Sequence, residues 1–369
     1  MLANHRYFPA TGGTERGVQV LAENLVIRGH QATVLTQQEP GVPEEEWIHG
    51  VRVVRIPIRV IAGVRVPSGY LRRLRSMDAD LFHLNGNRIW CADFYFPVAR
   101  LFQWPQVLTG HGFYQYAIHP RARDRWYFER YLPRVVRAFD AYACRTDYER
   151  NQLASWGVPR EMLWRIPDGV DTGEFASHAE LSRALRDRWA LPTPLVAVYA
   201  GGFFENKRVD HLIEAVAKVR DRWGLVLLGR DVPSSPYNAA QCAALAERLG
   251  VSLRIMGPVA RPEVVASFLA ADAIVSASEY EGFGLAIAES LAAGRPFVAW
   301  RTGAIPEMAA TGAGVAVDSV AALAEALLRL EDDAVRTEMG RRAREASKDW
   351  SIDAMVNETL DMYRHVMST

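Results

Sequence analysis

The sequence predicts an α/β protein made of two Rossmann-like, doubly wound units, each with a parallel sheet covered by helices on both faces. Three observations lead to this expectation. The chain has 369 residues, more than the roughly 100–200 residues of one typical domain. Short apolar runs are followed repeatedly by helix-length amphipathic segments, which is the β–α–β pattern of a parallel sheet. Proline and glycine cluster in the middle of the chain, which places a hinge between about 168 and 193.

The first half begins with a short strand candidate, residues 1–4, which is either a short strand or one whose start is missing, because roughly five or six residues are usual. A helix is expected at Thr14–Arg28, where Gly29 stops it. Further helices are expected around 90–102, 122–138 and 146–156. The other strand candidates of this half are Gln31–Thr36, Val51–Ile56, Leu81–Leu84, Gln106–Thr109 and Ala141–Cys144.

The second half shows the pattern most plainly. Its strand candidates are nearly all apolar, as expected when both faces of a sheet are buried; they are Leu195–Ala200, Gly224–Gly229, Ser252–Met256, Ala273–Ser276, Pro296–Trp300 and Gly314–Val317. Helices are expected near 208–221, 238–250, 261–270 and 285–293. We therefore place one domain at 1–170 and the other at 171–349, with a last helical segment, about 350–369, as a candidate to pack back on the first domain.

The charge of the chain argues against nucleic acid as a partner. Lys and Arg number 43 and Asp and Glu number 43, so the formal net charge is zero, unlike that of a polycationic nucleic-acid-binding protein. This balance hides an asymmetry, because residues 1–170 contain 22 basic and 16 acidic residues and residues 171–369 contain 21 and 27. The first half is thus basic, at +6, and the second acidic, at −6.

The three cysteines, Cys91, Cys144 and Cys242, are far apart and form no CxxC pair, so neither a zinc site nor a disulfide framework is expected. This usage fits a reducing compartment. No stretch approaches the roughly 18 uncharged apolar residues of a membrane span, and His5 and Arg6 come too early for a signal peptide. We expect a cytoplasmic protein.

The sharpest motif runs from Ser278 to Glu289, from the end of a strand into a helix. Gly282 and Gly284 allow the backbone to approach a ligand closely, and the amides at the helix start form an anion site. Glu281 and Glu289 supply carboxylates, which accept hydrogen bonds from sugar hydroxyls well. The alternative is that Glu281 only compensates the helix dipole and Glu289 is a solvated helix residue.

Two further glycine loops join a strand to a helix. Gly12-Gly13 follows the first strand, and paired glycines there place backbone amides around a phosphate. Gly201-Gly202 begins the second loop, which continues to Lys207 and Arg208. Lys207 is one of only three lysines in the chain, and its ammonium at this loop is placed to neutralise a diphosphate leaving group. A solvated Lys207 is the alternative.

A histidine stands at the end of another strand candidate. His111 is flanked by Gly110 and Gly112, at the edge where α/β sheets bind ligands. The glycines favour a loop that a substrate approaches closely, so His111 is a candidate site residue. The alternative is a structural histidine, as His83 at a similar strand end illustrates.

With these motifs in order, the sequence resembles the family 4 retaining glycosyltransferases of the GT-B fold (glycosyl transferases group 1). The resemblance covers essentially the whole chain. It is carried by the Gly12-Gly13 loop, Arg28-Gly29-His30 before a strand, Pro167–Asp171 at the hinge, the Lys207 loop with Val209-Asp210, Glu281 and Glu289 with seven residues between them, and the turn Thr302–Glu307.

The resemblance implies two Rossmann-like domains that face each other across a cleft, an N-terminal acceptor domain and a C-terminal nucleotide-sugar donor domain. Glu281 would contact the donor sugar and Glu289 the ribose. Lys207 and the amides of Phe283, Gly284 and Gly13 would face the diphosphate. His111 would lie beside the donor sugar, near the anomeric centre.

The implied activity is transfer of a hexose from a UDP- or GDP-sugar to a hydroxyl acceptor, such as a glycan or glycolipid precursor, with retention of configuration. The nucleotide-sugar is then a substrate, and neither a cofactor nor a metal is expected. The implied catalytic residues are Glu281, His111 and Lys207. The implied donor-binding residues are Gly12, Gly13, Gly202, Lys207, Arg208, Glu281, Gly282, Phe283, Gly284 and Glu289.

The sequence departs from the family pattern at three places. Gly202 stands where an arginine usually precedes the lysine by five residues, Asp168 replaces the usual asparagine at the hinge, and the first strand is shortened. A lost charge-assisted contact to a phosphate costs roughly 1.5–3 kcal/mol. Arg208 and Arg230 are both candidates to replace the missing cation.

A basic and aromatic segment spans Arg121–Arg137 and includes Trp126 and Tyr131. Such a segment is a candidate for an anionic membrane surface or a lipid-linked acceptor, and then for a peripheral place on the inner face of the membrane. The alternative is a solvated helix whose aromatic side chains pack on the sheet.

Two other classes of function share this pattern. A nucleotide-sugar epimerase of the same architecture would release free sugar or a 2-epimer instead of a glycoside. A catalytically weak transferase retained as a binding subunit, suggested by Gly202 and the short first strand, would keep its biological role when Glu281 is replaced by alanine.

Overall fold

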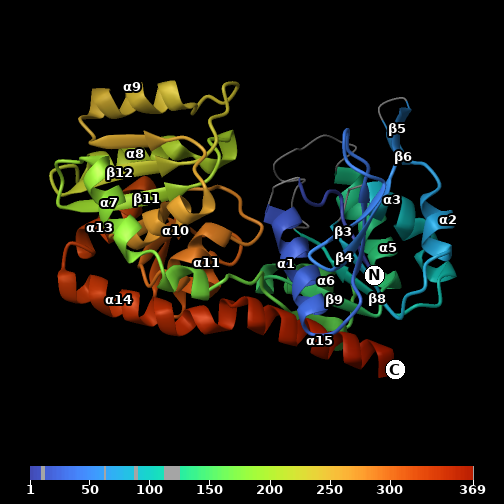
Figure 1. The fold of residues 1–369 in the computed structure, drawn as a ribbon. Helices are drawn as coiled ribbons and strands as arrows, with labels where there is room; N and C mark the ends of the chain where they lie inside the picture. Colours follow the sequence, from blue (N-terminus) through green and yellow to red (C-terminus); the bar gives the residue numbers. More distant parts are fainter. Residues whose placement is uncertain (10–12, 62–63, 87–89, 112–124, 369) are drawn as a thin grey trace. The chain divides into compact units, whose positions relative to one another are not determined.

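The computed structural model describes all residues except 10–12, 62–63, 87–89, 112–124 and 369 (Figure 1). Within this part the chain forms two compact units. Unit 1 comprises Met1–Gly169 and Ile352–Thr369, and unit 2 comprises Val170–Ser351. Each unit is built on a parallel sheet, which confirms the predicted α/β fold of two Rossmann-like units.

Unit 1 contains an eight-stranded sheet whose order is β10-β9-β8-β7-β1-β2-β4-β3. All pairings are parallel except that of β3 with β4. The strands are β1 (Leu2–Ala3), β2 (Thr33–Gln37), β3 (Glu45–Ile48), β4 (Val51–Ile56), β7 (Phe82–Asn85), β8 (Gln106–Thr109), β9 (Ala141–Cys144) and β10 (Leu163–Arg165). The first strand is short, but it lies in the middle of the sheet between β2 and β7.

The helices of unit 1 cover both faces of this sheet (Figure 1). Within the described residues they are α1 (Gly13–Ile27), α2 (Tyr70–Arg75), α3 (Trp90–Tyr95), α5 (Leu132–Val135), α6 (Asp147–Ser155) and α15 (Ile352–Ser368), with short 3₁₀ helices η1 (Phe96–Leu101), η4 (Val136–Ala138) and η5 (Arg160–Met162) and a short π-helix η3 (Tyr127–Tyr131). A separate hairpin pairs β5 (Ile58–Ile61) with β6 (Val64–Pro67).

The C-terminal helix α15 belongs to the core of unit 1. Its buried side chains, among them Val356, Leu360 and Tyr363, share one apolar cluster with α1 and with residues from several strands. The hydroxyl of Tyr363 hydrogen-bonds with Nδ1 of the buried His83 at 2.6 Å, and Nε2 of His83 with the Thr109 hydroxyl at 2.7 Å. The last helical segment therefore packs on unit 1, although it follows unit 2 in sequence.

Unit 2 contains a six-stranded parallel sheet of order β13-β12-β11-β14-β15-β16. Its strands are β11 (Leu195–Ala200), β12 (Trp223–Leu228), β13 (Leu253–Met256), β14 (Ala273–Ser276), β15 (Phe297–Trp300) and β16 (Gly314–Val317). Its helices and single turns are η6 (Gly173–Ala176), α7 (Ala179–Trp189), η7 (Glu205–Lys207), α8 (Val209–Ala217), α9 (Ala239–Leu249), α10 (Arg261–Ala270), α11 (Leu285–Ala292), α12 (Ile305–Ala309), α13 (Val320–Arg329), α14 (Asp333–Ala346) and η8 (Ser347–Trp350).

Alternation along the strands divides the core of unit 2 into two layers. Val196 and Val198 of β11 face one cluster, with buried residues of α7, α10 and α11. Leu195, Ala197 and Tyr199 face the other, with buried residues of α8, α9 and α13. Because side chains alternate across a strand, one apolar run serves both layers.

The expected hinge of about 168–193 is not a linker in the structure. After η6, residues 179–189 form α7, whose Leu185 and Trp189 are buried against α10 in unit 2. The polar composition of this segment concealed a helix that has only a narrow apolar stripe. The boundary between the units falls between Gly169 and Val170, at the start of this segment and one residue before the predicted domain boundary.

Candidate functional site

The loops that carry most candidate residues of unit 2 follow β11 and β14. These strands are neighbours in the sheet, and the chain leaves β11 toward β12 on one side and returns through β14 on the other. This is the topological switch point of the sheet, where α/β proteins bind ligands at the carboxyl ends of the strands. The backbone joins the two loops, since the Glu279 amide donates to the Asn206 carbonyl at 2.9 Å.

Lys207 and Glu281 meet at this point. The Lys207 ammonium donates a hydrogen bond to Oε1 of Glu281 at 2.7 Å, although 74 residues separate them. Their side chains are only 21% and 20% exposed. The structure thus brings together the lysine and the carboxylate that the two loop motifs singled out separately, in a place partly screened from water.

Helix α11 begins beside Glu281. Gly284 is its N-cap and has φ 97°, a conformation that favours glycine. A Cβ atom there would also lie 2.9 Å from Cδ1 of Ile305. Phe283 is buried and packs against Trp350, with ring centroids 5.6 Å apart. The chain is therefore held so that the positive end of the α11 dipole lies at the switch point, where it favours an anion.

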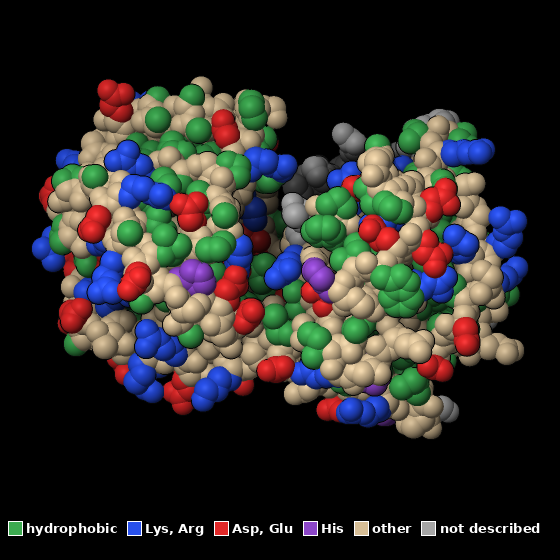
Figure 2. Space-filling model, in the orientation of Figure 1, with side chains coloured by type: hydrophobic (Ala, Val, Ile, Leu, Met, Phe, Trp, Pro, Cys, Tyr) green, Lys and Arg blue, Asp and Glu red, His purple; other side chains and the backbone are tan. Residues whose placement is uncertain are grey.

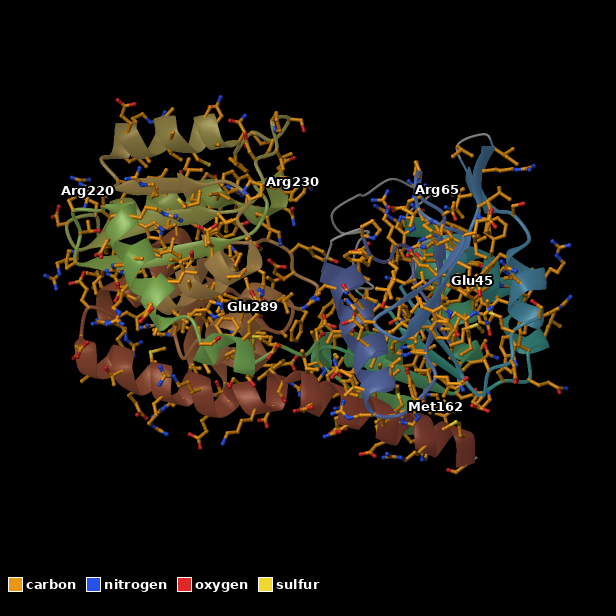
Figure 3. The ribbon with its side chains drawn as sticks, in the orientation of Figure 1. Glu45, Arg65, Met162, Arg220, Arg230 and Glu289 are labelled. Atoms are coloured by element: carbon orange, nitrogen blue, oxygen red, sulfur yellow. The ribbon has the colours of Figure 1, made fainter. Side chains whose placement is uncertain are left out.

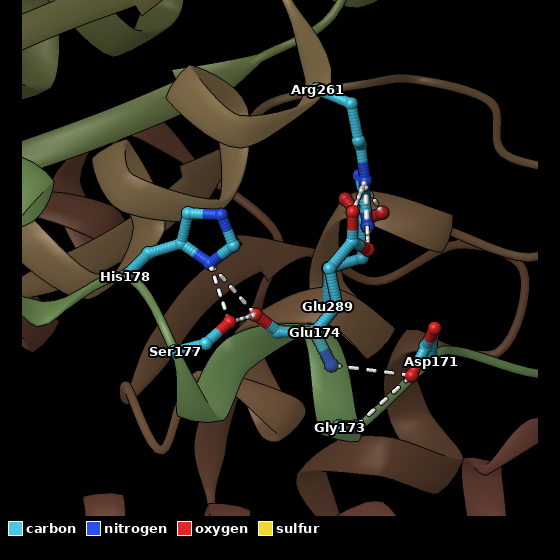
Figure 4. A network of polar contacts seen from close by, with 7 residues as sticks. All are labelled: Asp171, Gly173, Glu174, Ser177, His178, Arg261 and Glu289. Carbon is cyan, nitrogen blue, oxygen red and sulfur yellow. Dashed lines mark hydrogen bonds and ion pairs between the residues drawn. The ribbon is translucent and has the colours of Figure 1, made fainter.

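Glu289, one turn further into α11, belongs to an ion-pair network (Figure 4). It is 8% exposed, and Nη1 of Arg261 donates to its Oε1 at 2.5 Å. The same guanidinium holds Glu174 of η6, with Nε at 3.1 and 3.0 Å from the two carboxylate oxygens and Nη2 at 2.8 Å from Oε2. Although burial opposes the charge of Arg261, its hydrogen bonds with Glu174 and its interactions with Glu289 raise its pKa.

The loop that presents Glu174 is itself ordered by a carboxylate. Oδ1 of Asp171 accepts hydrogen bonds from the Gly173 and Glu174 amides at 3.1 and 3.2 Å (Figure 4). Sequence reasoning did not find Arg261 or Glu174, because the partners lie 28 and 87 residues from Arg261 and no spacing pattern relates them.

Arg208 is bound to acidic side chains. Its guanidinium donates to Asp210 at 3.1 and 3.0 Å and to Glu279 at 2.5 Å. Gly202 lies under the ring of Phe204, since a Cβ at this position would be 2.6 Å from Cε2 of that ring. Gly202 and Arg208 both lie in the loop that follows β11, at the switch point. That they contact a nucleotide-sugar donor stays a prediction.

In unit 1, His111 follows β8 in the left-handed region, at φ 52°. Its Nε2 lies 3.4 Å from Oδ1 of Asn85 at the end of the neighbouring strand β7. Burial, and then the charges of Arg145 and His83, lower the pKa of His111 well below its usual value, so the ring is neutral at physiological pH. A neutral imidazole presents one donor and one acceptor nitrogen.

Arg145 and Asp168 form an ion pair at 3.1 Å in unit 1, and Arg145 also binds Glu149 at 3.1 Å. The residue that replaces the asparagine of the family pattern, Asp168, therefore has a cation beside it. Gly13 begins α1, and a Cβ there would meet nothing within 4 Å. Gly12 lies outside the described residues.

The described part of the basic segment Arg121–Arg137 starts at residue 125, so Arg121 and Arg123 lie outside it. Phe128 and Leu132 are buried in the core of unit 1, whereas Trp126 is 59% exposed. The arginines of this part, Arg125, Arg130, Arg134 and Arg137, are exposed. On the visible face of each unit, cationic and anionic side chains are interspersed (Figure 2).

The described residues contain no group of three or more His, Cys, Asp and Glu side chains placed to hold a metal ion. Among the same residues, no helix is both long enough and apolar enough to span a membrane.

Comparison with known families matches both halves of the chain. Residues 11–174 match the model described as Glycosyltransferase Family 4, and residues 194–333 match that of Glycosyl transferases group 1. The resemblance stated from the sequence is thereby confirmed.

Two curated relatives and one solved structure illustrate the likeness. The chain is 33% identical over 242 residues to a D-inositol 3-phosphate glycosyltransferase of Xylanimonas cellulosilytica, which covers 62% of the chain and 58% of that relative. It is 28% identical over 306 residues to a GDP-mannose-dependent alpha-mannosyltransferase of Mycobacterium tuberculosis, covering 79% of the chain and 76% of that protein. Sucrose-phosphate synthase of Thermosynechococcus elongatus has a similar fold, with a TM-score of 0.83 at 21% identity over 100% of this chain and 98% of that one.

Proposed function

The chain belongs to glycosyltransferase family 4, and on that premise we propose that it transfers a hexose from a nucleotide-diphosphate sugar to a hydroxyl acceptor. The observation that carries the proposal is the Lys207–Glu281 pair, at 2.7 Å, beside the N-terminus of α11 at the switch point of unit 2. An ammonium and a helix dipole at one place favour a diphosphate. The carboxylate beside them accepts hydrogen bonds from the hydroxyls of the sugar.

We assign the donor to unit 2. Lys207 and the amides at the start of α11 bind the diphosphate, Glu281 binds the sugar, and Glu289 binds the ribose hydroxyls. The donor is a UDP- or GDP-sugar, and the M. tuberculosis relative, which is named as GDP-mannose-dependent, supports a test of GDP-mannose first. The acceptor is a glycan or glycolipid precursor bound by unit 1.

We propose that transfer retains the anomeric configuration and requires no metal. The acceptor oxygen attacks the anomeric carbon on the face that the phosphate leaves, the bond between that carbon and the phosphate oxygen breaks, and the acceptor proton passes to the leaving phosphate. No protein base is then needed. Lys207 and the α11 dipole stabilise the charge that develops on the diphosphate, and His111 contacts the substrates as a neutral imidazole.

Thermal unfolding with UDP, GDP and ADP tests the donor site. A ligand that binds only the folded chain stabilises it by RT ln(1 + [L]/Kd), so at least one of the three raises Tm. A chain that responds to none of them has no donor site, and the proposal fails.

Mass spectrometry of the products tests the reaction. The chain is incubated with a panel of donors, a membrane extract as acceptor, and a chelator in parallel reactions. A glycoside formed equally with the chelator present is the expected product, and NMR of the purified glycoside should show the anomeric configuration of the donor. Free sugar or a 2-epimer from UDP-GlcNAc would indicate an epimerase, and binding without turnover would indicate a binding subunit.

We also propose that unit 1 associates with anionic membrane. The exposed Trp126 and the exposed arginines of the basic segment support this association, because an aromatic ring beside cationic side chains suits the interface of an anionic bilayer.

A further inference from the structure

Three cationic side chains stand on the two adjoining loops that follow β11 and β12 in unit 2: Lys207, Arg208 and Arg230. Lys207 is paired with Glu281 at 2.7 Å. Arg208 contacts Asp210 at 3.0 Å and Glu279 at 2.5 Å. Arg230 is exposed, and among the described residues no carboxylate lies within ion-pair distance of it. Of the three, it is the cation whose charge the protein does not already neutralise.

The backbone fixes Arg230 beside the loop that follows β11. The Phe203 amide donates to the Arg230 carbonyl at 3.0 Å, and the Gly201 amide to the Leu228 carbonyl at 2.8 Å. Gly229 has φ 142°, and a Cβ there would lie 2.0 Å from the Gly201 carbonyl oxygen. The loops after β11 and β12 are therefore in contact at the backbone, and only glycine at 229 allows this approach.

The side chain of Arg230 is placed by an aromatic ring. Its guanidinium carbon lies 5.3 Å from the centroid of the Phe204 ring, within the range of a cation–π contact. Phe204 is 40% exposed and occupies the space that a side chain at Gly202 would need, because a Cβ there would be 2.6 Å from the ring. The absence of a side chain at Gly202 thus leaves room for the Phe204 ring, and this ring in turn contacts the guanidinium of Arg230.

We propose that Arg230 binds the diphosphate of the donor and supplies the cation that position 202 lacks. The inference rests on the proposed function, since it assigns a further residue to the same site. The inference also chooses Arg230 over Arg208, the two residues that the sequence offered as replacements for the missing cation. Arg208 would have to break its contacts with Asp210 and Glu279 to reach a phosphate, whereas Arg230 has no such contact to break. A guanidinium also binds phosphate through two parallel hydrogen bonds.

Isothermal titration with the variant Arg230→Gln tests this assignment. The ligands are UDP, GDP and ADP, each compared with its nucleoside, which has the same base and ribose but no phosphate. The matched control is Arg220→Gln, because Arg220 is also exposed and stands before β12 whereas Arg230 stands after it, at the other end of the strand (Figure 3).

We expect Arg230→Gln to weaken binding of the nucleoside diphosphate by about 10- to 100-fold, to leave nucleoside binding unchanged and to preserve Tm. Arg220→Gln should change none of these. Equal diphosphate affinity in Arg230→Gln and wild type overturns the assignment, as does a loss shared by the nucleoside or by Arg220→Gln. A wild-type chain that binds none of the three diphosphates refutes the proposed function itself, so the two failures are distinguishable.

Discussion

Replacement of Arg261 by methionine removes the cation that joins Glu174 and Glu289. Charge-assisted hydrogen bonds contribute about 1.5–3 kcal/mol each, and Arg261 makes such bonds to both carboxylates. Its side chain is 38% exposed, so water replaces part of what is lost. Glu289 stays buried beside a second carboxylate without its cation, and we expect the free energy of unfolding to fall by about 2–3 kcal/mol.

Thermal unfolding of the full chain measures this effect. A loss of 1 kcal/mol lowers Tm by about 2–4 °C in a unit of this size, so Arg261→Met should unfold about 4–12 °C lower. The control is Arg341→Met, which removes an arginine from an exposed ion pair with Glu338 and should change Tm little. The triple variant with Glu174→Gln and Glu289→Gln should recover stability, because neither position then carries the negative charge that Arg261 neutralised.

The same network orients Glu289 for its proposed partner, the ribose. In wild type a nucleoside diphosphate should bind more tightly than its 2′-deoxy analogue, and Arg261→Met should reduce this difference at a temperature where the variant is folded. The reasoning is refuted if Arg261→Met has the Tm of wild type, or if the triple variant is less stable than Arg261→Met.

Three other predictions concern the remaining charged and aromatic groups. Glu281→Gln should lower turnover by at least about 100-fold. The variant should nevertheless bind the free nucleoside diphosphate about 2- to 5-fold more tightly, because Lys207 then gives up no ion pair with Glu281 when it binds the diphosphate. Weaker binding in a titration would contradict this. Burial lowers the pKa of His83 to about 3. Because the unfolded chain takes up this proton near pH 6.5, His83 alone should lower the free energy of unfolding by about 1.4 kcal/mol per pH unit from pH 6.5 toward pH 3, in addition to the contributions of His5 and His111, whose pKa values are also lowered. His83→Gln should flatten that decline in Tm, and an unchanged slope would exclude His83 as its source. Trp126→Ala should weaken co-sedimentation with vesicles that contain anionic phospholipid, and a wild-type chain that stays in the supernatant would remove the membrane proposal.

Most strands of the two sheets could be predicted from the sequence because they are short, mainly apolar runs that are buried. The strands β3, β5, β6 and β10 were not predicted, and β3, for example, contains no buried residue. Val51–Ile56, Leu195–Ala200 and Ala273–Ser276 coincide with β4, β11 and β14 residue for residue. The helix α7 was missed because most of its residues are polar and a proline-rich segment follows it. Leu185 and Trp189 are buried in the core of unit 2 and hold this helix there. The local composition of the segment does not indicate that burial.

The candidate site residues also fall into two groups, those that the sequence could indicate and those that it could not. Lys207 and Glu281 could be singled out because each stands in a glycine loop at the carboxyl end of an apolar strand, where the fold class itself places ligands. Arg261 could not, because the chain has 40 arginines and only tertiary packing decides which of them meets Glu289. For the same reason, the choice between Arg208 and Arg230 required the positions of Asp210 and Glu279.

The pairing of Lys207 with Glu281 has a consequence for the order in which parts of the donor are recognised. If the diphosphate takes the Lys207 ammonium, Glu281, only 20% exposed, loses that hydrogen-bond donor in a place where water replaces it poorly. Hydroxyls of the donor sugar can supply donors in its stead. We therefore expect the diphosphate to bind more tightly when the sugar is attached than when it is not. The free nucleoside diphosphate, which is the product of the proposed reaction, brings no sugar hydroxyls to Glu281, so the pair favours the intact donor over this product.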